Sequence, residues 1–332
     1  MSLLPVEHSL ALALRELLPE HTPWPASGEV AREALPSSRR VERFTPAGSE
    51  TAVVGKFFAA YPPATLSDCG LDREYHNYLW AGHLGLTRGL GLIPRLLGRR
   101  PQVRLGLVLE AVPGPDLDRV LFRACRQGEW ELLCRGLEKL AGLLAIFHTR
   151  DIPEYPVTPA PALEYFDKLK RQFLDLGLLT EEAGRAFQEE SRAWAPRLAG
   201  FPDRLVLVHG DATPTNFLFP DGRAVALDLE RLRPGDRLWD LSWVAGEIKH
   251  AWGLYAGSLE GAEPAISHFF TCYLNALPGA GALARRIFAL NPFYMAPAEL
   301  RIARNGYLSW EHRRALMAEA GRCLAHGRSL EL

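Results

Sequence analysis

The sequence predicts an α+β fold in two parts, a small part built on an antiparallel sheet and a larger, mainly helical part. Two observations predict this division. Short apolar runs separated by turn residues dominate the first third of the chain, and apolar residues at helical spacing dominate most of the remainder. The two patterns meet at Pro113-Gly114-Pro115, which is a strong break. We therefore expect a first domain over residues 1–112 and a second over residues 113–332.

Length and composition are those of a globular protein. At 332 residues the chain suits one large or two modest domains, and 48% hydrophobic with 23% charged residues is ordinary. A net charge of −1 argues against a protein that binds nucleic acid mainly through electrostatics. No apolar run has the length that a membrane span needs, so we expect no membrane partner. The five cysteines show no CxxC or metal-ligand spacing, which favours reduced thiols in a cytoplasmic protein.

The first part is predicted to contain one helix followed by strands. Residues 10–14 are apolar and end at Arg15-Glu16, which predicts an amphipathic helix rather than a signal peptide. Residues 20–38 are rich in Pro, Ser and Gly, and we expect them to form an irregular connection. Strands are expected over residues 39–45 and 51–59, which read as a hairpin, and then at 96–97 and 103–111.

A further helix is expected from Leu71 to Leu84, after the second of these strands. Apolar spacing places Tyr75, Tyr78 and Leu79 on its inner side. An acidic residue on the first turns of a helix complements the helix dipole, whatever else it does. The acidic residues on or near these turns are Asp68, Asp72 and Glu74.

Helices account for most of the second part. Asp116 is a good N-cap for a helix over residues 117–126, and a stripe of leucines predicts a core helix over residues 129–149. His148, at the end of that helix, is expected to be a structural, hydrogen-bonded histidine. Asp240 has the position of an N-cap for a helix over residues 241–252. Other helices are expected at 161–176, 180–198, 264–276, 279–290, 297–305 and 309–326.

Polar residues stand at the ends of short apolar runs in residues 205–230. The first run ends at His209-Gly210-Asp211, and two later runs are joined by turn residues at positions 220–222. The three strand-like runs therefore place an amide and three acidic side chains close together. Buried carboxylates need a neighbouring cation to neutralise their charge. Oxygen donors without cysteine suit a hard cation such as Mg²⁺ better than zinc. These residues are Asp211, Asn216, Asp228 and Glu230.

This segment resembles the catalytic segment of the aminoglycoside phosphotransferase and choline kinase-like family. The resemblance rests on His209-Gly210-Asp211, on Asn216 after four further residues, and on Asp228-Leu229-Glu230. Members of that family have the two-lobed protein-kinase-like fold and phosphorylate small molecules. The resemblance therefore implies a small antiparallel-sheet N-lobe, a larger helical C-lobe, and ATP and Mg²⁺ as cofactors.

The resemblance also implies a role for each of these residues. Asp211 is expected to be the catalytic base, and Asn216 and Asp228 are expected to be Mg²⁺ ligands, with help from Glu230. Glu230 stands where protein kinases have the Gly of Asp-Phe-Gly, which is the style of small-molecule kinases. Asp240 gains a second expected role, which is to tie its helix to the backbone of the catalytic loop.

Lys56 is expected to be the lysine that contacts the nucleotide phosphates. Only five of the 38 basic residues are lysines, and none but Lys56 lies in the first 138 positions, so a compact ammonium in a strand is unusual for this chain. An edge-strand lysine that discourages aggregation has the same appearance. In the resembling family the partner is a Glu on the following helix, which favours Glu74 over Asp68 and Asp72.

Two further nucleotide contacts follow from the resemblance. A hinge whose backbone binds adenine is expected near Glu110 to Val112. No Gly-rich loop precedes Lys56, and Ser37-Ser38 are the candidates for a phosphate-covering loop, where backbone N–H groups make the contact.

The sequence thus predicts an ATP- and Mg²⁺-dependent phosphotransferase that acts on a hydroxyl of a small molecule, of the aminoglycoside, sugar or amino alcohol type. The alternative is a nucleotide-binding pseudokinase. A metal-dependent hydrolase would need further ligands close to His209. A protein kinase would need an activation loop, for which the residues between Asp228 and Asp240 are too few. The mixed charges of residues 151–200 favour no class of acceptor, and the oligomeric state is left open.

Overall fold

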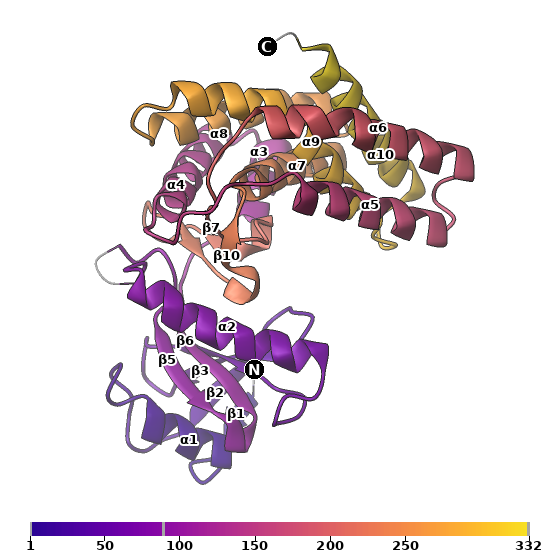
Figure 1. Ribbon diagram of the computed structural model, residues 1–332. Helices are drawn as coiled ribbons and strands as arrows, with labels where there is room; N and C mark the ends of the chain where they lie inside the picture. The colour runs from indigo at the N-terminus through magenta and orange to yellow at the C-terminus, as the bar shows by residue number, and fades with distance from the viewer. Residues whose placement is uncertain (1, 88–89, 331–332) are drawn as a thin grey trace. The chain divides into compact units, whose positions relative to one another are not determined.

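The computed structural model describes residues 2–87 and 90–330 (Figure 1). The chain divides into two compact units, which we call the sheet unit (Met1–Gly114 with Val225–Leu232) and the helical unit (Pro115–Ala224 with Arg233–Leu332). The first division lies two residues beyond the boundary expected after residue 112. Residues 225–232, which carry Asp228 and Glu230, differ from the expectation because they belong to the sheet unit.

A six-stranded antiparallel sheet forms the core of the sheet unit, in the order β1-β2-β3-β4-β6-β5. The hairpin expected over residues 39–59 is confirmed, whereas the irregular connection expected over residues 20–38 is wrong, because it contains β2. That strand pairs with β1 on one side and β3 on the other, so pairing rather than local composition makes it a strand. The strands are β1 (Ser2–Leu4), β2 (Val30–Ala34), β3 (Val41–Pro46), β4 (Val53–Phe57), β5 (Leu96–Arg100) and β6 (Leu105–Glu110).

The sheet places a helix on each face (Figure 1). Val53 and Phe57 on β4 share a buried apolar cluster with Leu14 of α1 (Ser9–Leu17). On the other face, a Cβ at Gly106 of β6 would lie 2.7 Å from Leu71 of α2 (Leu66–His83). Because side chains alternate along a strand, Lys56 on β4 points away from the α1 cluster and towards α2.

Helix α2 begins earlier than expected, because the hydroxyl of Thr65 caps it by accepting a hydrogen bond from the Asp68 N–H at 3.0 Å. Tyr78 is buried as expected, but the prediction that Leu79 faces inward is wrong, since Leu79 is 42% exposed. The buried residues of α2 instead follow one stripe at helical spacing, which is Leu71, Glu74, Tyr78 and Ala81.

The helical unit contains most of the helices of the chain (Figure 1). Almost every residue of α7 is buried from Leu238 to Trp252, so this helix lies at the centre of the unit. A two-stranded antiparallel ribbon of β7 (Val206–Val208) and β10 (Arg233–Gly235) lies beside the helices. The helices are α3 (Leu117–Gln127), α4 (Trp130–His148), α5 (Ala160–Asp175), α6 (Glu181–Gly200), α7 (Leu238–Tyr255), α8 (Glu263–Asn275), α9 (Gly281–Ala303) and α10 (Trp310–Ser329). Short pieces are η1 (Pro101–Val103), η2 (Pro214–Asn216), β8 (Phe217–Leu218), β9 (Val225–Ala226), η3 (Leu229–Arg231) and η4 (Glu260–Ala262), with β9, η1 and η3 in the sheet unit.

Two helices expected at residues 279–290 and 297–305 are in fact one continuous helix, α9. It contains Pro292 and Pro297, each of which removes a backbone hydrogen bond and normally ends or kinks a helix. Most of the apolar side chains around these prolines are buried, among them Ile287, Phe293 and Leu300, whereas Phe288 is exposed. Tertiary packing therefore keeps the helix continuous where local sequence favours a break.

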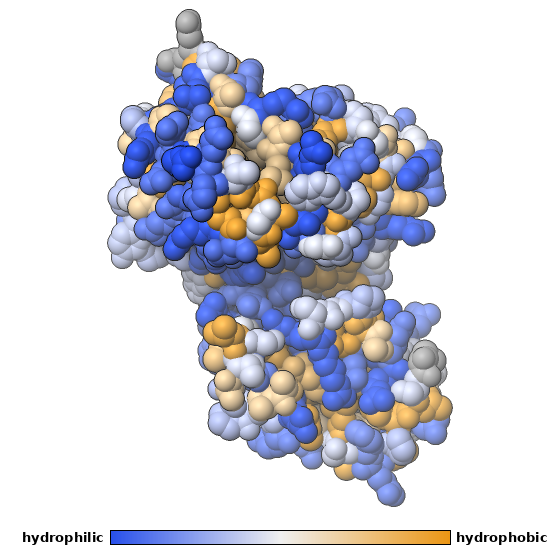
Figure 2. Space-filling model, turned by 90° about the vertical axis from the view of Figure 1, so that its right-hand side faces the viewer, coloured by the Kyte–Doolittle hydropathy of each residue, from blue (hydrophilic) through white to orange (hydrophobic). Residues whose placement is uncertain are grey.

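No helix in the described part of the chain combines the length and the apolar character that crossing a membrane requires. On the face shown in Figure 2, hydrophilic residues cover most of the surface, and apolar residues form groups among them.

Candidate active site

Lys56 and Glu74 form an ion pair inside the sheet unit. The Nζ atom of Lys56 lies 2.7 Å from Oε1 of Glu74, and the Glu74 side chain is fully buried. The other two acids considered for this role bind elsewhere. Asp68 accepts hydrogen bonds from the N–H groups of residues 59 and 60, and Asp72 pairs with Arg99 at 2.8 Å. The preference for Glu74 as the partner of Lys56 therefore agrees with the contacts.

Asp228 lies on the other side of the same ammonium. Its Oδ1 atom is 3.4 Å from Nζ of Lys56 and is buried, while the side chain as a whole is 41% exposed. The backbone of Asp228 has a φ of 54°, a left-handed conformation that costs energy for a residue with a side chain. Such strain is characteristic of functional sites, because the surrounding structure must hold it in place.

The pKa of Glu74 is raised to about 7. Burial is the main cause, since it disfavours the charged carboxylate. The ammonium of Lys56 opposes this effect, and the negative charge of Asp228 adds to it. The charge of the group therefore changes near neutral pH.

The segment after Asp228 is held against α2 by contacts that the sequence did not predict. The side-chain amide of Asn77 donates to the carbonyl oxygen of Leu229 at 2.7 Å. The carboxylate of Glu230 accepts from Arg39 at 2.5 Å and lies so close to Gly70 that a Cβ there would be 2.5 Å from Oε1. Glu230, expected as a metal ligand, is thus held by a guanidinium. One available signal for Asn77 was its spacing from Glu74, three residues along the same helix.

The residues expected to contact the nucleotide lie in the turn after β2 and at and beyond the end of β6. Ser37 and Ser38 lie in the turn between β2 and β3, directly before Arg39. Glu110 ends β6, and its carboxylate accepts from Arg95 at 2.6 Å. Val112 follows in the segment that leads out of the sheet unit and is half-buried.

The loop that carries Asp211 follows β7 in the helical unit and is fixed by Asp240. The buried carboxylate of Asp240 accepts from the N–H of His209 at 2.7 Å and from the N–H of Gly210 at 2.9 Å. The expectation that Asp240 ties its helix to this loop is therefore confirmed, and the N-cap role is wrong. Helix α7 begins at Leu238, whose N–H donates to Asp236 instead.

A buried chain of hydrogen bonds continues from Asp240 to α4 and α8. Nε2 of His148 lies 3.3 Å from Asp240, and Nδ1 lies 2.8 Å from the hydroxyl of Tyr273. Burial would raise the pKa of Asp240, but hydrogen bonds from His148 and the Gly210 N–H outweigh burial, so that pKa is lowered. Burial lowers the pKa of His148. His148 is thus buried and hydrogen-bonded, as expected.

Asn216 is fixed to the same loop. Its side-chain nitrogen donates to the carbonyl oxygen of Asp211 at 2.9 Å, so its amide oxygen is the atom suited to a metal ion. The N–H of Thr213 donates to the same carbonyl at 2.7 Å. The backbone around Asp211 is therefore held in one conformation before any ligand binds.

The structure thus brings the expected residues together in two groups, one in each unit. Lys56, Glu74, Asp228 and Glu230 lie together in the sheet unit, and Asp211 and Asn216 lie together in the helical unit. In the sheet unit, Asp228 offers carboxylate oxygens, and its buried Oδ1 forms no hydrogen bond among the described residues, although the Lys56 ammonium lies 3.4 Å away. In the helical unit, Asn216 offers an amide oxygen. Oxygen donors of this kind suit Mg²⁺.

Comparison with known proteins identifies the family. Residues 39–265 match the profile described as the phosphotransferase enzyme family. No curated protein sequence matches the chain.

Solved structures with the same fold include three kinds of phosphotransferase. The ethanolamine kinase of Plasmodium vivax is 12% identical, with 90% of this chain and 81% of that chain covered and a TM-score of 0.55. Choline kinase LicA from Streptococcus pneumoniae is 17% identical, with coverage of 96% and 98% and a TM-score of 0.54. The ternary complex of streptomycin, ATP and APH(2'')-IIa is 14% identical, with coverage of 98% and 100% and a TM-score of 0.53. The expected protein-kinase-like fold is therefore confirmed, and the profile match over most of its length shows that this chain belongs to the phosphotransferase enzyme family.

Proposed function

We propose that this protein is a kinase that uses ATP and Mg²⁺ to phosphorylate a hydroxyl group of a small molecule. The observation that carries the proposal is the position of Lys56, whose ammonium lies between the buried Glu74 and the strained Asp228. Binding of a nucleoside triphosphate requires a cation that contacts the phosphates, one carboxylate that orients this cation, and a second carboxylate that binds a metal ion. The family match and the small-molecule kinases of the same fold support this assignment.

Each residue has a role in this proposal. Lys56, oriented by Glu74, contacts the phosphates, and Ser37 and Ser38 cover them with backbone N–H groups. The backbone from Glu110 to Val112 contacts the adenine. Asn216 and Asp228 are the proposed Mg²⁺ ligands, with help from Glu230. Mg²⁺ held by these residues would neutralise negative charge on the phosphates.

Asp211 is the proposed base. Its carboxylate takes the proton of the acceptor hydroxyl as that oxygen forms a bond to the γ-phosphorus, and ADP leaves with the electrons of the broken P–O bond. The Asp240 contacts to His209 and Gly210 hold the loop before substrate arrives, so little energy is needed to position the base.

The acceptor is proposed to be an amino alcohol, an amino sugar or an aminoglycoside. The solved structures of the same fold include kinases of choline, ethanolamine and glucosamine and the phosphotransferase bound to streptomycin. The helical unit supplies both acids and bases along α5 and α6, so its sequence does not select among these classes.

An acceptor screen tests the proposal. Purified protein with Mg-ATP is incubated with each class of acceptor, and ADP release and the phosphorylated product are measured together. We expect one class to raise ADP release far above the rate without acceptor. Asp211→Asn serves as the matched control for contaminating kinases. Mg-ATP binding with no turnover on any acceptor class would instead indicate a nucleotide-binding protein without catalysis.

A further inference from the structure

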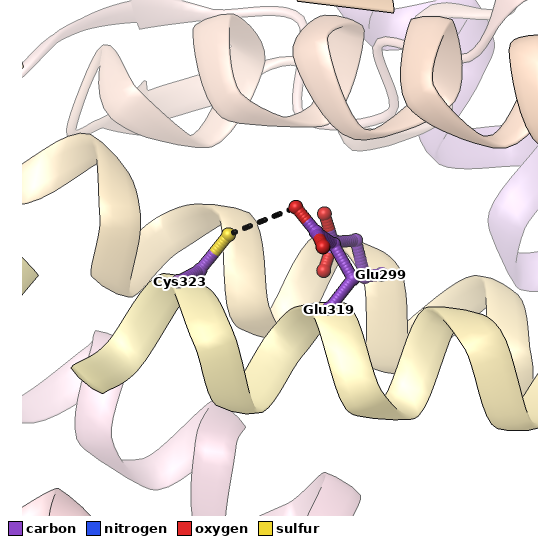
Figure 3. A group of neighbouring side chains, drawn as sticks. All are labelled: Glu299, Glu319 and Cys323. Atoms are coloured by element: carbon purple, nitrogen blue, oxygen red, sulfur yellow. Dashed lines mark hydrogen bonds between the residues drawn. The ribbon is translucent and has the colours of Figure 1, made fainter. Parts of the chain in front are cut away.

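A second group of ionisable side chains lies between α9 and α10 of the helical unit. It contains Glu299 on α9 and, one turn apart on α10, Glu319 and Cys323 (Figure 3). One ligand atom from each residue lies within 4.8 Å of the others. Figure 3 shows the two carboxyl groups side by side, with the sulfur of Cys323 directed towards Glu319. None of these residues has a role in the proposed phosphoryl transfer.

Glu299 is the member of this group that most needs an explanation. Its side chain is fully buried, and neither carboxyl oxygen has a hydrogen-bond partner among the described residues. A buried polar group without a partner is costly, and in native proteins it often marks a bound water or ion that supplies the missing contact.

Glu319 is already oriented for ligation by two neighbouring cations. Lys249 of α7 and Arg322 of α10 both donate to its carboxylate, and the distance from Arg322 Nε is 2.7 Å. Lys249 also pairs with Glu263 at 2.7 Å. Carboxylates that bind metals are commonly held by such outer hydrogen bonds, which leave further lone pairs on each oxygen.

The acidic groups here outnumber the basic ones, which favours binding of a divalent cation. Three carboxylates, Glu260, Glu263 and Glu319, pair with the two cations, Lys249 and Arg322. Ionised Glu299 and Cys323 would add two further negative charges, which form no ion pair with these cations. One divalent cation supplies the matching charge, and the displaced protons pass to solvent.

The group is also accessible from one side. A cavity of about 710 Å³ is lined by Lys249, Glu319 and Cys323 together with apolar side chains such as Ile266 and Met295. Glu299 does not line this cavity, so it forms the closed side of the group. A cation bound here would have three protein ligands and a fourth position facing the cavity.

We propose that Glu299, Glu319 and Cys323 form a binding site for a divalent transition metal of the zinc type. A thiolate with two carboxylates selects zinc-like ions over Mg²⁺, which prefers oxygen alone. Metal–ligand distances of about 2.0–2.3 Å place the ligands of a tetrahedral zinc roughly 3.5 Å apart, so rotation of these side chains closes the group around the ion. The site is independent of the proposed kinase activity.

Cobalt spectroscopy of the full-length protein tests this proposal directly. Metal-stripped protein is titrated with Co²⁺ in the absence of nucleotide, and the absorption band that arises only from thiolate bound to cobalt is followed. We expect the band to saturate at one equivalent of Co²⁺ and to disappear when Zn²⁺ is added. Wild-type protein that shows no such band overturns the proposal, and the group is then a structural ion cluster held by Lys249 and Arg322.

Variants assign the band to these residues. Cys323→Ser should abolish the band, and Glu299→Gln should weaken Zn²⁺ binding about tenfold or more, measured by competition with a chelating dye. Cys125→Ser is the matched control, because Cys125 is also a partly buried cysteine of the helical unit, and it should leave the band unchanged. A band that persists in Cys323→Ser overturns the assignment. Far-ultraviolet circular dichroism checks that each variant folds, and failure of the acceptor screen would not affect any of these readouts.

Discussion

Lys56 is the basic side chain at the centre of the candidate site in the sheet unit. Its ammonium contacts a fully buried carboxylate at 2.7 Å and a partly exposed one at 3.4 Å, so its position depends on both. A buried ion pair is costly to break by removing one partner, because the remaining charge has no compensation. Replacement of Lys56 should therefore be costly, whereas replacement of a lysine on the surface would be tolerated.

The base assignment predicts the behaviour of Asp211→Asn. The amide keeps the shape of the side chain but cannot accept the proton, and positioned base catalysis typically contributes about 10²–10⁴-fold. We expect kcat to fall by that order while the Kd of Mg-ATP stays nearly unchanged. Steady-state kinetics and calorimetric titration with Mg-ATP measure the two quantities. Unchanged turnover in this variant would remove the base assignment.

The raised pKa of Glu74 predicts a pH dependence. Below about pH 7 the carboxyl group holds a proton, so the ion pair with Lys56 lacks its negative partner. Above that pH the carboxylate is charged and orients the ammonium. We therefore expect the Kd of Mg-ATP to decrease as pH rises through about 7.

Glu74→Gln separates this effect from the titration of ATP itself, which both proteins share. The variant should lose the part of the pH dependence that belongs to Glu74 and bind Mg-ATP more weakly above pH 7. Identical pH profiles for the two proteins would show that the charge of Glu74 does not control binding.

At the scale of elements, one face of α2 organises the candidate site of the sheet unit. Gly70, Glu74 and Asn77 are spaced by four and three residues and therefore lie on the same face. Gly70 makes room for Glu230, Glu74 binds Lys56, and Asn77 holds the carbonyl group of Leu229. The helix thus connects the strand that carries the lysine with the segment that carries the proposed metal ligand, Asp228.

Gly70→Ala tests this arrangement. The added Cβ would lie 2.5 Å from Oε1 of Glu230, so the carboxylate must move although Arg39 holds it. We expect the Mg²⁺ concentration needed for half-maximal ATP binding to rise several-fold and the stability to change by less than about 1 kcal/mol, since the ion pair is partly exposed.

Gly142→Ala is the matched control for this substitution. It lies in α4, where a Cβ meets no atom within 4 Å, and Ala is the better helix former by about 1 kcal/mol. Denaturant unfolding and ATP binding at several Mg²⁺ concentrations measure both variants. An equal Mg²⁺ requirement in Gly70→Ala and Gly142→Ala would mean that the contact between Gly70 and Glu230 does not affect Mg²⁺-dependent ATP binding.

At the scale of the whole molecule, each unit holds its own part of the candidate site through internal contacts. The sheet unit fixes Asp228 through Lys56 and the contacts of α2, and the helical unit fixes the Asp211 loop through Asp240 and His148. Both groups are therefore formed in the protein without ligand.

The proposed nucleotide binding predicts stabilisation by Mg-ATP. A ligand that binds only the folded protein at about 100 times its Kd stabilises it by about 2.7 kcal/mol. We expect the thermal unfolding midpoint to rise with Mg-ATP, and the rise to shrink when a chelator removes Mg²⁺ or when Lys56 is replaced in Lys56→Met. A midpoint that is indifferent to every Mg-nucleotide would contradict the proposed function.

Much of the fold was predictable because its signals are local. The Pro-Gly-Pro break, the helical stripes and the capping residues act over a few positions, and the chain forms the expected elements there. Strand β2 and the continuous helix α9 were not predicted. The first is a strand because its neighbours pair with it, and the second stays continuous because its buried side chains outweigh two prolines.

The sequence by itself determined the candidate chemistry, because Asp211 and Asn216 lie on one short loop, and Asp228 and Glu230 on one short segment, where spacing fixes their separation. The family resemblance named Glu74 and Asp240 for their roles, but only the tertiary structure showed that Glu74 meets Lys56, that Arg39 holds Glu230, and that Asp240 anchors the loop. Those contacts join residues 18, 191 and 31 positions apart. Separations of that size are set by the packing of whole elements, which no local pattern records.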